Sequence, residues 1–406
     1  MSGEKKKMDN KKFIGNRLKS ARQFRGLGIT DLAKLVDISK QSLSLYENGD
    51  NIPPYENVMA LARVLEFPYE FFMREDKCTT VTDNTYFRSQ ASATKKERLA
   101  QAVKLEYVAK MYEVLLEYVD FPTIDLPQIQ FWGTDDLSEY DSDEVLKEIE
   151  TIADTVRSAW NLGRGPIKNL QYILEEHGII VTGFKAVNQK IDAFSQRIHV
   201  PGEEYMYMIA LALGAKPEQR LRFDMAHELG HILLHPWGEE IEDLTKDEFN
   251  GREKQANMFA SAFLLPRDSF GADVEPYATD LEYYKYLKKK WNMSMQAMMY
   301  RARQLEIITA NQFQYMMRRV SKNGWRTQEP GDVPGNMNDT IFQGAIDILF
   351  ETGYLDAKSL IHDFGRYGII MRENDIENLL CLREGTLKVE DKIVPLIRVK
   401  TQIEND

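Results

Sequence analysis

Two histidines four positions apart, with a glutamate directly after the first, lie in the middle of segment 222–235: His227, Glu228 and His231. On a helix, side chains four positions apart lie one turn apart on the same face, so both imidazoles can reach one metal ion. Glu228 can then accept a proton from a water molecule at the metal. The H-E-x-x-H array therefore predicts a zinc hydrolase site. The alternative is an amphipathic helix whose histidines are merely satisfied polar groups.

A zinc site needs a third protein ligand, and a catalytic one leaves the fourth position for water. The best candidate is Glu253, which opens a run of helical apolar spacing. The small residues Ala256 and Ala260 would let this second helix approach the first, so that a carboxylate at its start reaches the metal. His235 lies one turn past the pair, which favours a role in orienting a ligand or at the helix end. The acidic residues of 239–248 could also ligate, although most are expected to be solvated.

The N-terminal part of the chain contains four short runs with helical apolar spacing, separated by tight breaks. The runs cover residues 14–24, 30–36, 39–46 and 55–65. Thr30 and Ser39 are natural N-caps, and Ala33 is small enough to let the second and third helices cross. The pattern predicts an all-α helix-turn-helix domain over residues 10–76.

Both regions resemble known families. The run Arg222-Phe-Asp-Met-Ala-His-Glu-Leu-Gly-His-Ile-Leu-Leu-His235, followed by Glu253-Lys-Gln-Ala-Asn-Met-Phe-Ala260 and Leu264-Leu-Pro266, is similar to the ImmA/IrrE metallopeptidases, which process repressors in mobile elements and stress responses. The resemblance extends over residues 150–330. It implies that His227, His231 and Glu253 bind Zn²⁺ and that Glu228 is the general base.

The run Asp37-Ile-Ser-Lys-Gln-Ser-Leu-Ser-Leu-Tyr-Glu-Asn-Gly49 resembles the Cro/C1-type (XRE) DNA-binding domain. The recognition helix would present Lys40, Gln41 and Ser44 to base edges in the major groove of double-stranded DNA. Ser39 and Thr30 would contact phosphates at helix N-termini. The alternative is a dimerisation or protein-docking module that has lost DNA binding.

Charge and composition agree with a nucleic-acid-binding N-terminus. Residues 1–40 carry eight Lys and three Arg against four acidic residues, whereas the whole chain has a net charge of −11. A chain of 406 residues is expected to form two or three domains. Without an apolar run of about twenty residues, no membrane span is expected. The two distant cysteines, Cys78 and Cys381, indicate a reducing cytoplasm and no cysteine-based metal site.

The fold class is predicted as α+β and mostly helical, with a small sheet in a zincin-like peptidase domain. Residues 79–96 read as a polar linker without strands, and helix returns over 97–118. Strands are expected at 179–184, 197–200 and 205–210, and one of them is expected to hold a peptide substrate as an added strand at a sheet edge. Two helices over 281–305, with Ser294 as N-cap, could pass for a second helix-turn-helix, but they are read as structural. The C-terminal region is expected to hold helices at 341–351 and 357–367 and strands at 369–371 and 393–399.

The predicted domains are 10–76 for DNA binding, 77–145 as linker and connecting helix, 146–330 as peptidase, and 331–406 as a mixed helical region of unassigned role.

These features predict a cytoplasmic DNA-binding regulator fused to a zinc endopeptidase. Its substrate would be a repressor or antitoxin-like protein, or the chain itself within residues 76–96. The alternative is a transcription factor whose zincin-like domain senses a small molecule or a metal and cleaves nothing. A homodimer is compatible with the sequence, and no membrane partner is expected.

Overall fold

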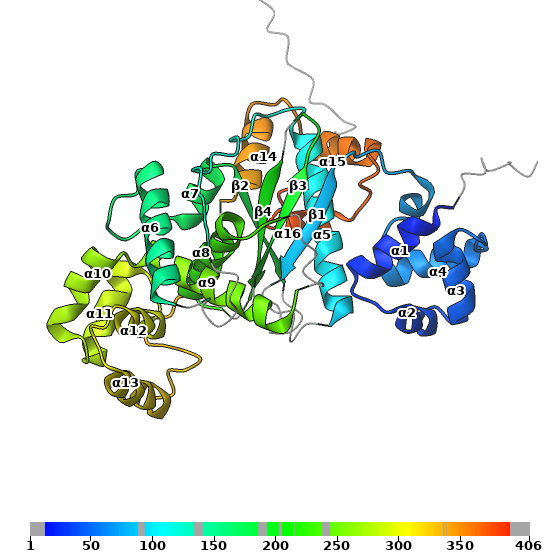
Figure 1. Ribbon diagram of the computed structural model, residues 1–406. Helices are drawn as coiled ribbons and strands as arrows, with labels where there is room; N and C mark the ends of the chain where they lie inside the picture. The colour runs from blue at the N-terminus through cyan, green and yellow to red at the C-terminus, as the bar shows by residue number, and fades with distance from the viewer. Residues whose placement is uncertain are drawn as a thin grey trace, which may run out of the picture.

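The computed structural model describes residues 13–87, 94–133, 140, 142–185, 193–202, 205–214, 216–237, 244–335, 337 and 339–389. Within these residues, helices surround a four-stranded sheet, which confirms the α+β, mostly helical class (Figure 1). The helix-turn-helix region lies at one end of the molecule, and a group of helices from the middle of the chain lies at the other (Figure 1). Among the described residues, no helix is both long enough and apolar enough to span a membrane.

The N-terminal helices follow the predicted runs: α1 (Gly15–Phe24), α2 (Ile29–Leu35), α3 (Lys40–Asn48) and α4 (Tyr55–Leu65), followed by the 3₁₀ turn η1 (Tyr69–Met73). Ser39 is the N-cap of α3, because its Oγ accepts a hydrogen bond from the Ser42 N–H at 2.9 Å. The prediction that Thr30 caps α2 is wrong. Gly28 holds that position, and its N–H donates to the Asp31 carboxylate at 3.1 Å, so the helix start is satisfied without a hydroxyl cap.

The helix-turn-helix unit is held by a buried ion pair and a close helix crossing. The Arg22 guanidinium on α1 donates to both carboxylate oxygens of Glu47 on α3, at 2.6 and 2.8 Å. At Gly15 a Cβ atom would lie only 2.3 Å from the Tyr46 carbonyl oxygen. The first helix can therefore cross the recognition helix at this distance only with glycine there.

The sheet contains β1 (Val81–Phe87), β2 (Ile179–Lys185), β3 (Ala193–His199) and β4 (Met206–Leu213). Their order is β1-β3-β4-β2; β2 runs parallel to β4, and the other pairs are antiparallel. The expectation of a strand-free linker over 79–96 is wrong, because β1 lies inside it and pairs with β3, with Tyr86 opposite Ser195. Pairing with a distant strand overrides the polar local composition. β3 also begins four residues before the predicted start at 197.

Helices cover both faces of the sheet. One face carries α5 (Lys95–Leu115), α14 (Ile341–Glu351), α15 (Ala357–Arg366) and α16 (Glu373–Leu379). The other side of the molecule holds α6 (Asp143–Ala159), α7 (Leu170–Glu176), α8 (Glu218–Leu234), α9 (Lys246–Leu264), α10 (Arg267–Val274), η3 (Glu275–Tyr277), α11 (Leu281–Trp291), α12 (Met295–Gln304) and α13 (Ala310–Lys322). Neighbouring residues of β2 point into different cores, Ile179 into the second and Ile180 into the first. The sheet therefore separates two apolar cores.

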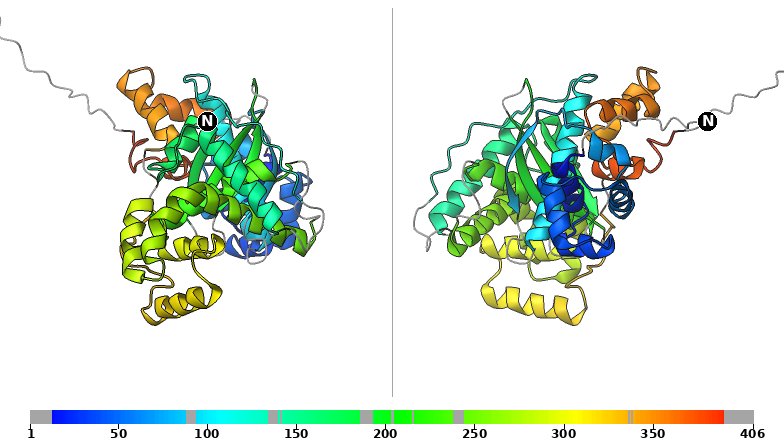
Figure 2. Two further views of the ribbon diagram at one scale, coloured as in Figure 1. Left: turned by 60° about the vertical axis from the view of Figure 1, so that its left-hand side comes forward. Right: turned by 90° about the vertical axis from the view of Figure 1, so that its right-hand side faces the viewer.

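The C-terminal helices pack beside α5 and contact the helix-turn-helix region (Figure 2). The Arg25 guanidinium donates to both carboxylate oxygens of Asp375, at 2.9 and 2.6 Å. The buried Arg17 side chain donates to the Gly368 carbonyl oxygen at 2.9 Å. Residues 369–371 were expected as a strand, which is wrong: they form a short coil between α15 and α16 whose apolar side chains enter the core without a ladder. The strand predicted at 393–399 lies outside the described residues.

A buried glutamate joins α7 to the C-terminal helices. Glu175, at the end of α7, is 6% exposed, and its carboxyl group accepts a hydrogen bond from the Ile341 N–H at the start of α14, at 3.2 Å. Burial raises the pKa of Glu175 to about 8, although this hydrogen bond and that from Gln171 oppose the rise. Glu175 is therefore neutral in the folded protein near pH 6 and ionised in the unfolded chain.

The Glu175→Gln variant should remove one source of pH-dependent stability. Because the folded-state pKa is raised, Glu175 contributes stability below its unfolded pKa, and this stability is lost as the pH rises toward about 8. Between pH 5 and 8, the free energy of unfolding of the wild type should fall relative to that of the variant by roughly 1 kcal/mol per pH unit. Urea unfolding at several pH values measures the difference, and parallel pH profiles for the two proteins would contradict the assignment.

Candidate metal centre

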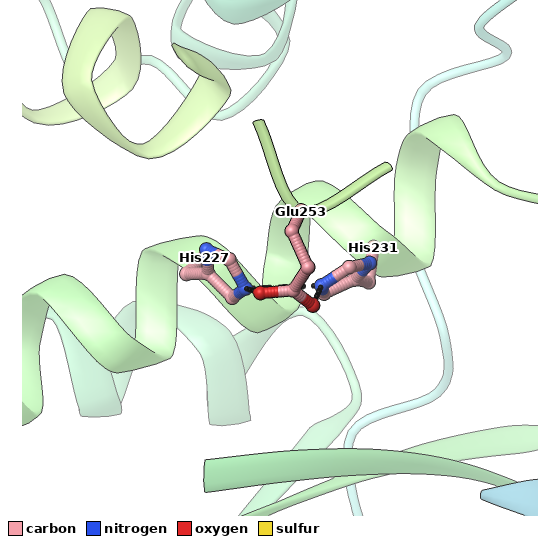
Figure 3. Close-up of side chains that lie close together, drawn as sticks. All are labelled: His227, His231 and Glu253. Carbon is pink, nitrogen blue, oxygen red and sulfur yellow. Dashed lines mark hydrogen bonds and ion pairs between the residues drawn. The ribbon is translucent and has the colours of Figure 1, made fainter. Parts of the chain in front are cut away.

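The structure brings His227, His231 and Glu253 together between α8 and α9 (Figure 3). The Nε2 atoms of the two histidines lie 3.0 Å apart. One carboxylate oxygen of Glu253 lies 3.5 Å from His227 Nε2, and the other lies 3.2 Å from His231 Nε2. Tetrahedral zinc with ligands at about 2.0–2.1 Å requires donor atoms about 3.3 Å apart. The three donor atoms therefore have the spacing that one zinc ion needs.

Close packing of α8 against α9 makes this meeting possible. A Cβ atom at Gly230 would lie 3.2 Å from the Cα and the carbonyl oxygen of Ala256, which is tighter than ordinary packing. Ala256 and Ala260 are fully buried, as expected for small residues at a helix crossing. Glycine on one helix and alanines on the other thus bring the two backbones within reach of one metal ion.

Glu253 lies in the middle of α9, and the expectation that it lies at the start of the helix is wrong. α9 begins at Lys246, where Thr245 Oγ1 accepts from the Glu248 N–H at 3.3 Å and the Thr245 N–H donates to Glu248 Oε2 at 2.7 Å. Part of the acidic segment 239–248 is therefore a helix cap and first turn. Its residues 239–243 lie outside the described residues.

An asparagine on α9 orients the first histidine. Asn257 donates through Nδ2 to the Glu253 carbonyl oxygen at 2.8 Å, so its Oδ1 atom faces His227 Nδ1 at 3.1 Å. The hydrogen on His227 then lies on Nδ1, and the Nε2 lone pair points at the cluster. Sequence reasoning missed Asn257, although its place four residues after Glu253 puts both on one helix face.

The second histidine is oriented by a longer relay. Burial, and then the nearby His231, hold the pKa of His235 well below 6.5, so this side chain is neutral. Its Nε2–H donates to Gln255 Oε1 at 3.1 Å, which leaves His235 Nδ1 to accept from His231 Nδ1–H at 2.9 Å. His231 therefore presents its Nε2 lone pair to the cluster. His235 has the orienting role expected of it, whereas Gln255 was missed.

The carboxylate of Glu253 is held in its charged form. Burial by itself would raise the pKa of Glu253, but the adjacent His227 and His231 side chains lower it well below the usual range. A carboxylate oxygen together with two imidazole nitrogens is a donor set that zinc accepts. The chemistry of the three residues thus agrees with their spacing.

The candidate general base lies beside these residues but outside the cluster of three. Glu228 is fully buried, and its Oε2 atom accepts a hydrogen bond from Ser195 Oγ on β3 at 2.7 Å. Ser195 is a further residue to which sequence reasoning gave no role, because nothing local links position 195 to position 228. The bond fixes one carboxylate oxygen of Glu228 against the sheet.

Of the three strands predicted as a possible peptide-binding edge, β3 and β4 lie inside the sheet and only β2 lies at an edge. β3 is paired on both sides, by β1 and β4, and β4 lies between β3 and β2. On β2, the Gly183 N–H donates to Cys381 Sγ at 3.1 Å. β1, from the segment read as a linker, therefore occupies the outer side of β3 next to Ser195.

The predicted DNA-contacting residues lie on α3, directly before α3 and in the first turn of α2. Thr30, Ser39, Lys40 and Gln41 are exposed, and Ser44 is half-buried. Thr30 lies in the first turn of α2, and Ser39 precedes α3. Four of the five predicted contact residues are therefore exposed to solvent.

Comparison with known families agrees with both resemblances. Residues 174–303 match the model of the IrrE N-terminal-like domain, a peptidase family, and residues 18–72 match a helix-turn-helix model. No curated protein matches the chain. The chain thus joins an XRE-type helix-turn-helix domain to a metallopeptidase-like domain of the ImmA/IrrE type, and the matched peptidase segment contains His227, His231 and Glu253.

Metal content should distinguish the candidate ligands from the candidate base. We expect about one zinc per chain in wild-type protein, because three donors and one open position complete a tetrahedral site. His227→Ala and His231→Ala should lose it, whereas Glu228→Gln should keep it. Elemental analysis after purification without chelators measures this.

The orienting hydrogen bonds can be checked in the same measurement. Asn257→Ala should bind zinc roughly 10–100-fold more weakly in competition with a chromogenic chelator, because His227 loses its Nδ1 partner. Lys254→Ala, an exposed change on the same helix, is the matched control and should bind zinc like the wild type. A metal-free wild type, or loss of metal in Glu228→Gln, would refute the assignment.

Proposed function

We propose that this protein is a DNA-binding transcriptional regulator whose zinc endopeptidase domain cleaves a repressor or antitoxin-like protein. The observation that carries the proposal is the meeting of His227, His231 and Glu253, with Glu228 buried beside them on the same helix as the two histidines. One hydrogen bond between His227 and Asn257 and another between His231 and His235 leave the Nε2 lone pairs of both histidines facing the Glu253 carboxylate. A histidine pair with a structural role alone would not need this arrangement. The family match of this region supports the same reading.

In this proposal the residues divide the work between metal binding and proton transfer. Zinc, when bound, would lower the pKa of a water molecule and polarise the peptide carbonyl. Glu228 accepts the proton of the attacking water and delivers it to the leaving amine. Ser195 donates to Glu228 Oε2 and so holds the carboxylate in one orientation during both transfers. His227, His231 and Glu253 keep their charge states and act as ligands.

Cleavage of the chain itself is a second candidate, favoured by one observation. β1 lies within residues 76–96, the segment expected as an internal cleavage site, and its residues 85–87 are paired with residues 194–196 around Ser195. The chain's own backbone thus takes the place where an extended peptide would pair with β3. A partner protein that uses this edge has to displace β1 first.

The DNA-binding part of the proposal rests on α3. Lys40, Gln41 and Ser44 would read base edges, while Ser39 and Thr30 would contact phosphates. We place the protein in the cytoplasm, where both DNA and a repressor substrate are accessible.

Replacement of Gln41 by Ala should weaken binding to the specific operator by roughly 1–3 kcal/mol and leave binding to scrambled duplex almost unchanged. The physical reason is that a glutamine side chain recognises a base, whereas scrambled DNA is held by phosphate contacts alone. Fluorescence anisotropy with both duplexes measures the two affinities. Gln128→Ala, an exposed change far along the sequence, is the control. Equal losses on both duplexes would remove Gln41 from base recognition.

Glu228→Gln should abolish cleavage while the fold, zinc binding and operator binding remain. Only the proton-transfer step is lost, and a general base typically contributes 10²–10⁴-fold in rate. The readout is a reporter on the regulated promoter, with immunoblots of this protein and of the candidate partner.

The alternative function is a transcription factor whose zincin-like domain senses a small molecule or a metal. Full induction by Glu228→Gln with all bands intact would establish that alternative, because a sensor needs the metal but no base.

A further inference from the structure

The helices after the metal centre carry a strong positive charge in an acidic protein. Residues 281–326 contain ten Lys and Arg against two acidic residues, a net charge of +8, whereas the whole chain has −11. From residue 307 to residue 328 there is no acidic residue at all. This segment comprises α11, α12 and α13, at the opposite end of the molecule from the helix-turn-helix region (Figure 1).

Part of this charge is used inside the protein. Arg301 is fully buried and donates to both carboxylate oxygens of Glu150. Lys288 is buried against Glu329 and Asp332. Lys285 and Lys290 also form ion pairs, with Glu282 and Asp273. These four cations therefore have structural roles.

The other six cations have no such role in the described part of the chain. They are exposed, and none of them forms an ion pair with another described residue: Lys289, Arg303, Arg318, Arg319, Lys322 and Arg326. Three of the six lie on α13, and Arg303 lies on the neighbouring helix α12. Like charges gathered on one surface repel each other, so such a cluster is expected where an anionic partner binds.

α13 combines a firmly packed side with a polar, basic side. Phe313, Met316 and Val320 are buried and hold the helix on the core. The exposed side carries amide, hydroxyl and guanidinium groups: Asn311, Gln314, Tyr315, Arg318, Arg319 and Lys322. These are the side-chain types that contact phosphate and sugar in protein–DNA interfaces.

The surface is rigid, as a binding surface on helices should be. Thr309 and Gln312 form a capping box at the start of α13. The Arg303 guanidinium lies 5.3 Å from the centre of the Phe313 ring, and the Tyr300 ring packs on Phe313 at 4.7 Å between centres. These contacts hold α13 against α12.

We propose that the exposed side of α12 and α13 binds the phosphate backbone of double-stranded DNA, as a second DNA contact in addition to α3. The long exposed side of α13 without acidic residues matches the charge of a duplex. The exposed aromatic side chains of this face, Tyr300 and Tyr315, end in hydroxyl groups, and tyrosine is among the side chains that contact phosphate and sugar. The second contact is independent of the metal centre and of peptide cleavage.

The salt dependence of DNA binding tests this proposal with the full-length protein and a duplex of scrambled sequence. The triple variant Arg318→Gln, Arg319→Gln, Lys322→Gln should bind at least tenfold more weakly near 100 mM salt. The slope of log K against log salt should become shallower by about 0.9 for each lost phosphate contact, hence by about 2–3 for the three cations. The operator should lose affinity by the same factor, because phosphate contacts carry no sequence information.

The matched control carries the same change in net charge on other exposed lysines: Lys147→Gln, Lys168→Gln, Lys358→Gln. It should keep the wild-type slope, and unfolding curves should show that both triple variants are folded. An α13 triple variant with the slope of the control would overturn the proposal. So would unchanged DNA binding together with loss of binding to an acidic polypeptide such as poly-glutamate, because the surface would then be a protein-docking face.

Discussion

The close crossing of α8 and α9 is the contact on which the candidate metal centre depends. Glu253 can reach the two imidazoles only because Gly230 lies against the backbone of Ala256. A Cβ atom at position 230 would require the Ala256 backbone to move by a few tenths of an ångström, and a metal site tolerates displacements of only about 0.5 Å. The same crossing brings Gln255 and Asn257 to the histidines. One helix interface thus supplies both a candidate ligand and the groups that orient the other two.

The sheet connects this interface to the rest of the molecule. Its β3 strand supplies Ser195 to Glu228, while the opposite face of the sheet belongs to the core shared by α5, the C-terminal helices and the helix-turn-helix region. Ion pairs such as Arg25 with Asp375 join the first and last parts of the chain across this core. The DNA-binding region therefore packs on the same body that carries the candidate metal centre, on the other side of the sheet.

Local patterns predicted the elements that local physics determines. The helix that carries the H-E-x-x-H array, the helix over 55–65 and the caps at Ser39 and Ser294 need only the neighbouring residues, and the structure contains each of them. β1 was missed because its partner is more than a hundred residues away, and a polar strand without that partner resembles a linker. The roles of Asn257, Gln255 and Ser195 depend on contacts between separate elements, which helical spacing cannot reveal. Thr30 is not the cap of α2, because Gly28 holds that position and its N–H donates to the Asp31 carboxylate.

The pairing of β1 with β3 also decides how the chain can be divided. A shortened protein that begins after residue 96 would contain His227, His231 and Glu253 but would lack the outer strand β1 of its sheet. The backbone groups of β3 would then form an open edge, which recruits strands from other molecules and promotes aggregation. A shortened protein that is meant to keep the whole sheet therefore has to retain β1, although β1 lies next to the helix-turn-helix region in the sequence.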